Sequence, residues 1–501
     1  MICLLLAILP LSLNVVVVMF VWWCGLGVLD RLCRFVPGFG PEWGSGGIFG
    51  LRFHRGVLYF TLSFEAKAYF LSEDYEMVYD FSLVGGGPRS GGDTYNAVAA
   101  VDDEIFFGGW VHAPVSFDRG RRELSFVTKY SHLHVYDVSE GRVNLLWKEG
   151  AGQKSMWAGE VSEILYDCVN HRLLVARGDG FRNLGVYSFD LEGKRMRCLS
   201  DRAALKGAVF LDWAVFNRGG LFFNGLQCVD LVSNEVLDVD VGMGGDVSRD
   251  GVGAGNPRVL GSMGVTSMGV VAFVKGGMFV GNPLEKSDEL GMVFVRLFDF
   301  ALSQCSPFRS NCLPVRGGLL VAYSSFPDTF SLRRSVVVPS LLVFVAPPMV
   351  KVVGVFGVRI TSMEKVGSKI VVAGNTTPNR AKPNAVDGGY REVSVLSDEI
   401  VDRRPPPYHV SLSGGVVRGG VWGGFPLTGY RNASLKIFAS RSNGLKVFEY
   451  DMELPVAGEP LVTKYQLNEG RNVIDLGGFH GVVSFMFEKV DEKSIIFLEF
   501  S

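Results

Sequence analysis

The sequence has little charge, and the two signs nearly cancel. Charged residues make up 20% of the 501 residues, with 49 lysines and arginines against 51 aspartates and glutamates. In globular proteins, about a quarter of all residues are typically charged. A protein that binds nucleic acid usually carries a clustered basic surface. The composition therefore predicts no nucleic-acid partner.

Familiar catalytic and metal-binding motifs are missing as well. The chain has no G-x-S-x-G, no Walker A and no dinucleotide-binding glycine pattern. Its eight cysteines form no C-x-x-C pair, and none has zinc-finger spacing with histidine. Cys305 and Cys312 are near enough in sequence to pair, but one pair makes no disulfide framework. We expect reduced, buried thiols and no cofactor.

Apolar residues at helical spacing are also scarce, whereas residues typical of strands and turns abound. Apolar residues make up 48% of the chain, and it contains 63 glycines and 37 phenylalanines. Many turns and many β-branched or aromatic residues favour β structure. The sequence predicts an all-β protein with a sizeable core.

Similar apolar runs recur along the chain at intervals of roughly 48 residues. Most follow a polar or glycine turn and end in glycine, serine or asparagine. The runs are 57–64, 104–114, 172–180, 220–227, 270–277, 318–326 and 369–379.

The third repeat shows the structure of one unit. EVSEILYDC reads as a strand, VNHR as a turn and LLVARG as a second strand. NLGVYSFD and RMRCLS supply two more strands around the turn LEGK. Four short strands in about 40–50 residues are typical of a propeller blade. We predict a β-propeller of about seven four-stranded blades, with a range of six to eight.

The two ends of the chain differ from the repeats. We assign residues 36–427 to the propeller, with a proline-rich linker at 401–410. The stretch 414–427 could open an eighth blade. Residues 428–501 have strands at other spacings, which favour a small C-terminal β-sandwich or strands that close the ring.

Residues 1–29 form an apolar segment without a charged side chain. It is long enough to cross a bilayer, but it lacks the basic start and the cleavage site of a secretory signal. Arg31 and Arg34 follow it, so an anchor at residues 2–29 would leave the main domain cytoplasmic. The other reading is a misassigned start, with the true one near Val28 and a cytoplasmic protein.

Four segments carry a resemblance to a known family. They are FGPEWGSGGIFGLRFHRGVLYF (39–60), FFGGWVHAP (106–114), WAGEVSEILYD (157–167) and RGDGFRNLGVYS (177–188). Together they resemble an uncharacterised archaeal family, domain of unknown function 2139. The resemblance extends from about residue 28 to the C-terminus and is strongest in the first two hundred residues. It implies no activity, because none is assigned to the family.

Polar residues gather where first strands begin and second strands end, which is one end of a propeller channel. In the third repeat this places Trp157 and Glu160 near Arg177 and Asp179. In the second repeat, Tyr95 would lie near the pair at 110 and 112. The other ligand-binding candidates are Trp110, His112, Asn183 and Trp213.

Tryptophan beside carboxylate and amide groups suits a small polar ligand such as a sugar, and equally a peptide. We therefore favour a non-catalytic propeller that binds such a ligand or a protein partner. The alternative is a carbohydrate-active hydrolase or lyase that uses Glu160, Asp179 and His112. A simpler interpretation remains open: Asp-Gly is a favoured turn pair, and tryptophan at a strand end often only packs against a blade.

His132 and His134 are weak metal candidates. They are two residues apart on an expected strand, so both side chains lie on one face. Two such histidines can ligate zinc or copper, and His112 could supply a third ligand. No local spacing fixes that third ligand, and we predict no metal site.

Overall fold

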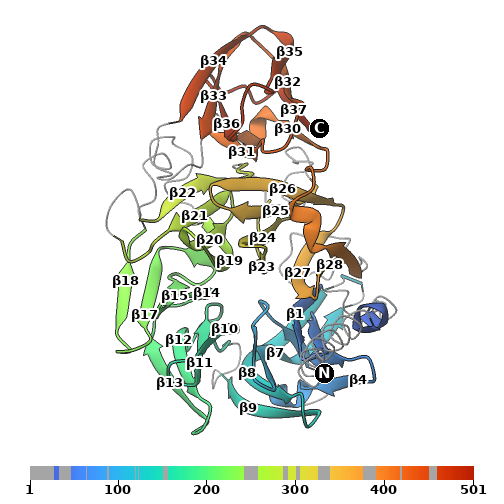
Figure 1. Cartoon of the computed structure of the whole chain (residues 1–501), viewed down its shortest axis with the longest axis vertical. Helices are drawn as coiled ribbons and strands as arrows, with labels where there is room; N and C mark the ends of the chain where they lie inside the picture. Colours follow the sequence, from blue (N-terminus) through green and yellow to red (C-terminus); the bar gives the residue numbers. More distant parts are fainter. Residues whose placement is uncertain are drawn as a thin grey trace, which may run out of the picture.

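The described residues of the computed structural model form nine antiparallel sheets (Figure 1). Seven sheets surround a common axis, and the last two stack at one side of that ring. The predicted β-propeller is therefore confirmed. The described ranges are 27–32, 47–63, 65–86, 90–118, 120–121, 123–150, 156–241, 258–285, 291–300, 305–324, 339–375, 391–417, 420–450 and 460–501.

Blades 1 to 3 are each built from strands that are consecutive in sequence. Blade 1 holds β1 (Ile48–His54), β2 (Val57–Leu62), β3 (Lys67–Leu71) and β4 (Glu76–Asp80), followed by the short helix η1 (Ser82–Gly85). Blade 2 holds β5 (Gly91–Asp93), β6 (Val98–Val101), β7 (Glu104–Asp118), β8 (Glu123–Asp137) and β9 (Arg142–Gly150). Blade 3 holds β10 (Val161–Asp167), β11 (Arg172–Arg177), β12 (Gly185–Asp190) and β13 (Arg195–Ser200).

Blades 4 to 7 complete the ring. Blade 4 holds β14 (Gly207–Phe210), β15 (Trp213–Asn217), β17 (Leu226–Asp230) and β18 (Val236–Val239). Blade 5 holds β16 (Phe222–Phe223), β19 (Arg258–Thr266), β20 (Gly269–Val274), β21 (Gly277–Gly281) and β22 (Val293–Arg296). Blade 6 holds β23 (Leu313–Val315), β24 (Gly318–Tyr323), β25 (Ser340–Ala346) and β26 (Met349–Phe356). Blade 7 holds β27 (Arg359–Val366), β28 (Lys369–Asn375) and β29 (Arg391–Ser397), followed by η2 (Asp398–Val401).

The recurring apolar runs are mostly the second strands of the blades. Every residue of β2, β20 and β24 is buried, because neighbouring blades cover both faces of these strands. Outer strands are more exposed, and β4 alternates between exposed and half-buried residues. This difference explains why the second strand gives the strongest signal in the sequence.

Blade 4 departs from this rule. Its second strand is β15, whereas the run at 220–227 covers β16 and the start of β17. β16 pairs with β19 and so extends the sheet of blade 5.

Blades 1 and 7 meet through side-chain packing. Leu58 and Phe60 of β2 share a buried cluster with Val371 and Ala373 of β28. The short helix at residues 27–32 covers this seam and adds Val28, Leu29 and Leu32 to the cluster. Arg31 also donates a hydrogen bond to the carbonyl of Glu73.

We expect Leu32→Ala to lower the free energy of unfolding by about 2 kcal/mol, because it leaves a cavity in the seam. The lower end of the Leu→Ala range applies because the helix is short. Urea unfolding measures the effect. Leu83→Ala is the matched control, since Leu83 is exposed and its loss should change stability by less than about 0.5 kcal/mol. Equal effects of the two substitutions would show that the helix does not support the seam.

The C-terminal strands form a two-layer sandwich, which is drawn above the ring in Figure 1. Phe425 of one sheet contacts Phe500 of the other, with ring centroids 5.4 Å apart. One sheet contains β30 (Tyr408–Ser413), β37 (Ile495–Phe500), β32 (Ala433–Ala439) and β35 (Gly470–Asp475). The other contains β31 (Trp422–Pro426), β36 (Val482–Phe487), β33 (Asn443–Tyr450) and β34 (Leu461–Leu467); the short helix α3 (Gly414–Val417) links β30 to β31.

The sandwich begins earlier than the expected boundary at residue 428. β30 pairs with β37, and β31 pairs with β36, so residues 408–426 belong to the sandwich and not to an eighth blade. The physical reason is that Trp422 packs on Phe485, with ring centroids 4.8 Å apart. The local apolar pattern of β31 resembles a blade strand, but its partner β36 lies about sixty residues further along the chain.

Most of the apolar segment at residues 1–29, and with it the anchor reading, lies outside the described residues. Among the residues that the structure describes, no helix is both long and apolar enough to span a membrane.

Candidate functional site

The central polar site lies at the end of the ring where first strands begin and second strands end, which we call the entry end. In blade 3, Val161 at the start of β10 pairs with Arg177 at the end of β11. The backbone N–H of Glu160 donates to the carbonyl of Asp179 over 2.7 Å. The structure thus brings Glu160 and Asp179 together.

Blade 2 supplies the next two residues of the site. Asp93 ends β5, and Tyr95 follows in the segment that leads to β6. The hydroxyl of Tyr95 donates to Oδ2 of Asp179 over 2.9 Å, although the two residues are 84 positions apart. Tyr95 therefore joins blade 2 to blade 3 at the entry end.

Arg309 reaches the same place from the segment before blade 6. Its Nη1 donates to Oδ2 of Asp93 over 2.8 Å, and its Nη2 donates to the hydroxyl of Tyr95 over 3.3 Å. Its guanidinium carbon lies 4.5 Å from the centre of the Tyr95 ring. Arg309 thus crosses the ring from blade 6 to blade 2.

Lys129, on β8 of blade 2, completes the set. Its ammonium lies 3.5 Å from the ring centre of Trp110 and 4.2 Å from that of Trp157. Burial lowers the pKa of Lys129 to about 8, although Glu160 and Asp179 act in the opposite direction. We call Asp93, Tyr95, Lys129, Glu160, Asp179 and Arg309 the central cluster.

Glu160 is the exceptional member of the central cluster. Its side chain is fully buried, and neither carboxyl oxygen has a hydrogen-bond partner among the described residues. Burial, with help from the charge of Asp93, raises the pKa of Glu160 well above its usual value of 4.5. The carboxyl group is therefore a neutral acid over a wider pH range than an ordinary glutamate.

The pKa of Asp93 is shifted in the opposite direction. Burial is the largest single effect and acts to raise the pKa of Asp93, but the nearby groups Arg309, His112 and Lys129 together outweigh it and hold that pKa below the usual range. A hydrogen bond from Ser63 adds to the effect. One ionised carboxylate and one neutral carboxyl group thus lie close together, as acid–base chemistry requires.

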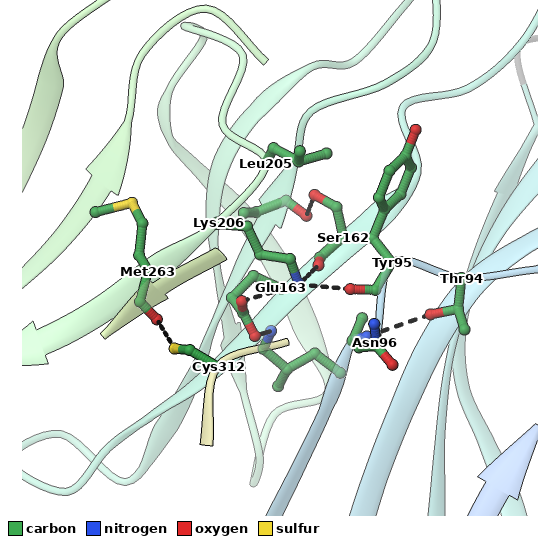
Figure 2. A network of polar contacts seen from close by, with 12 residues as sticks. Thr94, Tyr95, Asn96, Ser162, Glu163, Leu205, Lys206, Met263 and Cys312 are labelled. Atoms are coloured by element: carbon green, nitrogen blue, oxygen red, sulfur yellow. Dashed lines mark hydrogen bonds and ion pairs between the residues drawn. The ribbon is translucent and has the colours of Figure 1, made fainter. Parts of the chain in front are cut away.

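The buried side chain of Lys206 fixes the backbone beneath the central cluster (Figure 2). The ammonium of Lys206 donates to the carbonyls of Tyr95 over 2.5 Å and Ser162 over 2.9 Å. It also pairs with Oε2 of Glu163 over 3.1 Å. Lys206 precedes β14, so this one side chain links blades 2, 3 and 4 beneath Tyr95.

Arg177 ends β11 beside the start of β10, as expected, and its partners lie between blades. Arg177 is buried between blades, where it pairs with Glu149 over 2.6 Å and donates to the carbonyl of Gly159 over 2.9 Å. Asn183 is exposed in a turn with a left-handed backbone (φ 57°). Among the described residues, neither side chain hydrogen-bonds to a member of the central cluster, although Arg177 contacts Gly159, the residue before Glu160.

Trp213 lies at the opposite end of the ring. It starts β15 and pairs with Phe210, the last residue of β14, next to the far turn of blade 4. The physical reason is the register of this blade: the second strand runs from Trp213 to Asn217, so Asn217 and not Trp213 reaches the entry end.

The tryptophans at 110 and 157 and His112 do lie at the entry end. The indole N–H of Trp110 donates to the carbonyl of Ala158 over 2.7 Å, so this ring is fixed inside the protein. Trp157 is half-buried and stacks on Phe181, with ring centroids 4.9 Å apart. Burial, together with Lys129, lowers the pKa of His112 well below 6.5.

His132 and His134 share one face of β8, as expected from their spacing. Their Nδ1 atoms are 3.0 Å apart, and the His134 ring stacks on Phe107. Both rings are buried, and burial lowers the pKa of His134 to about 3. Within the described part of the chain, no group of three histidine, cysteine, aspartate or glutamate residues is placed to hold a metal ion.

Comparison with known proteins identifies the family. The family description "Uncharacterized protein conserved in archaea (DUF2139)" matches residues 58–382. The chain belongs to this family. The matched residues cover blade 1 from β2 onward and continue to the segment after β28, and so include the whole central cluster. No curated protein matches the sequence.

Solved structures give distant matches. A catalytically inactive virginiamycin B lyase from Staphylococcus aureus, solved with quinupristin, is 8% identical with a TM-score of 0.40, covering 67% of this chain and 94% of that one. Hsv2 from Kluyveromyces lactis is 10% identical with a TM-score of 0.30, covering 71% and 100%. The extracellular domain of a hybrid two-component system from B. thetaiotaomicron is 14% identical with a TM-score of 0.32, and the match covers 58% of this chain and 34% of that domain.

Proposed function

We propose that this propeller is a binding protein that takes a small polar ligand at the central cluster. The observation that carries the proposal is the buried carboxyl group of Glu160, whose two oxygens have no hydrogen-bond partner among the described residues. Buried polar groups in native proteins are nearly always hydrogen-bonded, so an exception calls for a functional explanation. A ligand that bonds to this carboxyl group supplies one.

The neighbours of Glu160 indicate the kind of ligand. The raised pKa keeps Glu160 protonated over a wider range, so it can donate a hydrogen bond to a hydroxyl or carbonyl oxygen. Asp179, which accepts from Tyr95, has further acceptor positions for a ligand hydroxyl. Trp157 and the exposed Phe181 stack into a flat apolar surface beside them. Flat rings next to carboxyl groups suit a sugar-like molecule.

The test is a thermal-shift screen of the full chain against sugars, nucleotides and divalent metals. A ligand that binds only the folded state stabilises it by about 2.7 kcal/mol at a hundredfold excess over Kd. We expect a sugar-like compound to raise the melting temperature, and Glu160→Gln and Asp179→Asn to abolish that rise.

Asp212→Asn is the matched control for this screen. Asp212 is an exposed carboxylate in the turn between β14 and β15, at the opposite end of the ring. The control should keep the full shift. A shift that survives in Glu160→Gln would show that the compound binds elsewhere and contradict the proposed site. The absence of a shift across the whole panel would contradict small-ligand binding and leave a protein partner as the ligand.

A second candidate function is acid–base catalysis on a carbohydrate, as a hydrolase or lyase. The observation that favours it is that the pKa of Glu160 is raised while the pKa of Asp93 is lowered. In such a pair the protonated group can act as the acid and the ionised group as the base. Recovery of the bound compound after incubation separates the two functions. An unchanged compound supports binding, and a cleaved one that needs Glu160 supports catalysis.

A further inference from the structure

The ammonium group of Lys129 is in an unusual environment. The side chain is only 7% exposed, and the ammonium lies between the indole rings of Trp110 and Trp157. It makes cation–π contacts with these two rings and with Phe126, and no described residue accepts a hydrogen bond from it or forms an ion pair with it. Buried lysines normally have such partners, as Lys206 does. The ammonium of Lys129 can therefore donate hydrogen bonds to a bound ligand.

The topology brings this ammonium to the same end of the ring as Glu160, whose carboxyl oxygens have no hydrogen-bond partner among the described residues. Lys129 forms a parallel bridge with Trp157, and its carbonyl accepts from the N–H of Ala158 over 3.4 Å. Glu160 follows two residues later, so strand β8 and the entrance to β10 bring the amine and the carboxyl group to the same end of the ring. The charge of Glu160 is also the strongest charge that acts on Lys129.

We propose that Lys129 is a reactive amine that captures an aldehyde or ketone group of a small ligand as an imine, with Glu160 as the proton donor. This inference rests on the proposed binding site and names a chemical class for its ligand, a carbonyl compound. Open-chain sugars belong to that class.

The step balances without any further reactant. The free amine attacks the carbonyl carbon, a C–N bond forms, and the proton lost by nitrogen goes to the carbonyl oxygen. Glu160 then gives its proton to the resulting hydroxyl group, which leaves as water while the nitrogen electron pair forms the C=N bond. The products are a protonated imine, water and the carboxylate of Glu160. Addition of water reverses the sequence and releases the ligand.

The surroundings of Lys129 favour the free amine that this step needs. Burial lowers its pKa to about 8, so roughly a quarter of it is unprotonated at pH 7.5, against about 0.1% of an ordinary lysine. Desolvated lysines of this kind serve as nucleophiles toward carbonyl groups in enzymes. The charged and titratable groups that face it are Asp93, His112, Glu160, Asp179 and Arg309.

The test is reductive trapping on the full chain with glycolaldehyde and sodium cyanoborohydride at pH 7.5. Peptide mass spectrometry reports the rate of labelling at each lysine. We expect Lys129 to be labelled at least about tenfold faster than the exposed Lys464, because its free-amine fraction is larger. The labelling rate at Lys129 should level off above about pH 8, whereas the rate at Lys464 should keep rising toward pH 10.

Two variants make the test specific. Lys129→Arg keeps a cation between the indoles and should lose the fast label, while Lys464→Arg should leave it unchanged. Glu160→Gln should slow labelling at Lys129 by about tenfold or more, because the proton donor is gone. A thermal melt of each variant confirms that it is folded.

The outcomes also separate this inference from the proposed function. A ligand-induced thermal shift without faster labelling of Lys129 would overturn the imine chemistry and leave reversible binding intact. Fast labelling of Lys129 without any thermal shift would support the reactive amine and contradict binding of the screened compounds. Labelling that is unchanged in Glu160→Gln would exclude Glu160 as the proton donor.

Discussion

Lys206→Met should lower the free energy of unfolding by about 3–5 kcal/mol. The substitution removes the ammonium that pairs with Glu163 and donates to the carbonyls of Tyr95 and Ser162. Breaking a buried ion pair from one side costs this much because the remaining charge stays buried without its partner. Burial already raises the pKa of Glu163 even with Lys206 beside it.

Urea unfolding measures this change, and two further variants isolate its cause. Lys464→Met is the matched control, because Lys464 is exposed on β34 and its loss should cost less than about 0.5 kcal/mol. The double variant Lys206→Met with Glu163→Gln should recover part of the loss, since no lone carboxylate remains. A loss in Lys206→Met no larger than in the control would show that the network in Figure 2 does not stabilise the ring.

Acid should destabilise the protein through His134. Its pKa in the folded protein is lowered to about 3 by burial, whereas an unfolded histidine titrates near its usual 6.5. Between these two values the unfolded chain binds more protons, so the stability contributed by neutral His134 is lost as the pH falls. The slope is about 1.4 kcal/mol per pH unit, or about 3 kcal/mol between pH 6.5 and pH 4.

The measurement is the difference in unfolding free energy between the protein and His134→Leu across this pH range. Taking the difference cancels carboxyl groups with raised pKa values, such as Glu160 and Glu364, which act in the opposite direction. The neighbours that face His134 are His132, Phe107 and Tyr79. His480→Leu is the control, because His480 is exposed. Parallel stability curves for the protein and His134→Leu would contradict the prediction.

Much of the fold follows from local patterns in the sequence. Fully apolar runs mark second strands that are covered on both faces, and their spacing predicts the blades. The same pattern is misleading where a strand has a different partner. β31 looks like a blade strand but pairs with β36 in the sandwich, and the run at 220–227 is not the second strand of blade 4.

Only part of the candidate site could be predicted from the sequence. Glu160 and Asp179 could be predicted as neighbours because both flank one pair of adjacent strands. Arg309 carried no local signal, since nothing in its own segment shows that it will contact Asp93, 216 positions away. The position of Arg177 at the end of its strand is clear from the sequence, whereas its partner Glu149 on blade 2 is not.

The sequence by itself determined the all-β character of the chain, its division into repeated four-stranded units and the pairing of Glu160 with Asp179. These depend on residues close together along the chain, where alternation and turn chemistry act directly. Only the tertiary structure decided that the Lys129 ammonium lies against the indoles of Trp110 and Trp157 and that Arg309 joins the central cluster. Those contacts depend on how the blades pack around the axis. The free energy of that packing cannot be predicted from any short stretch of residues.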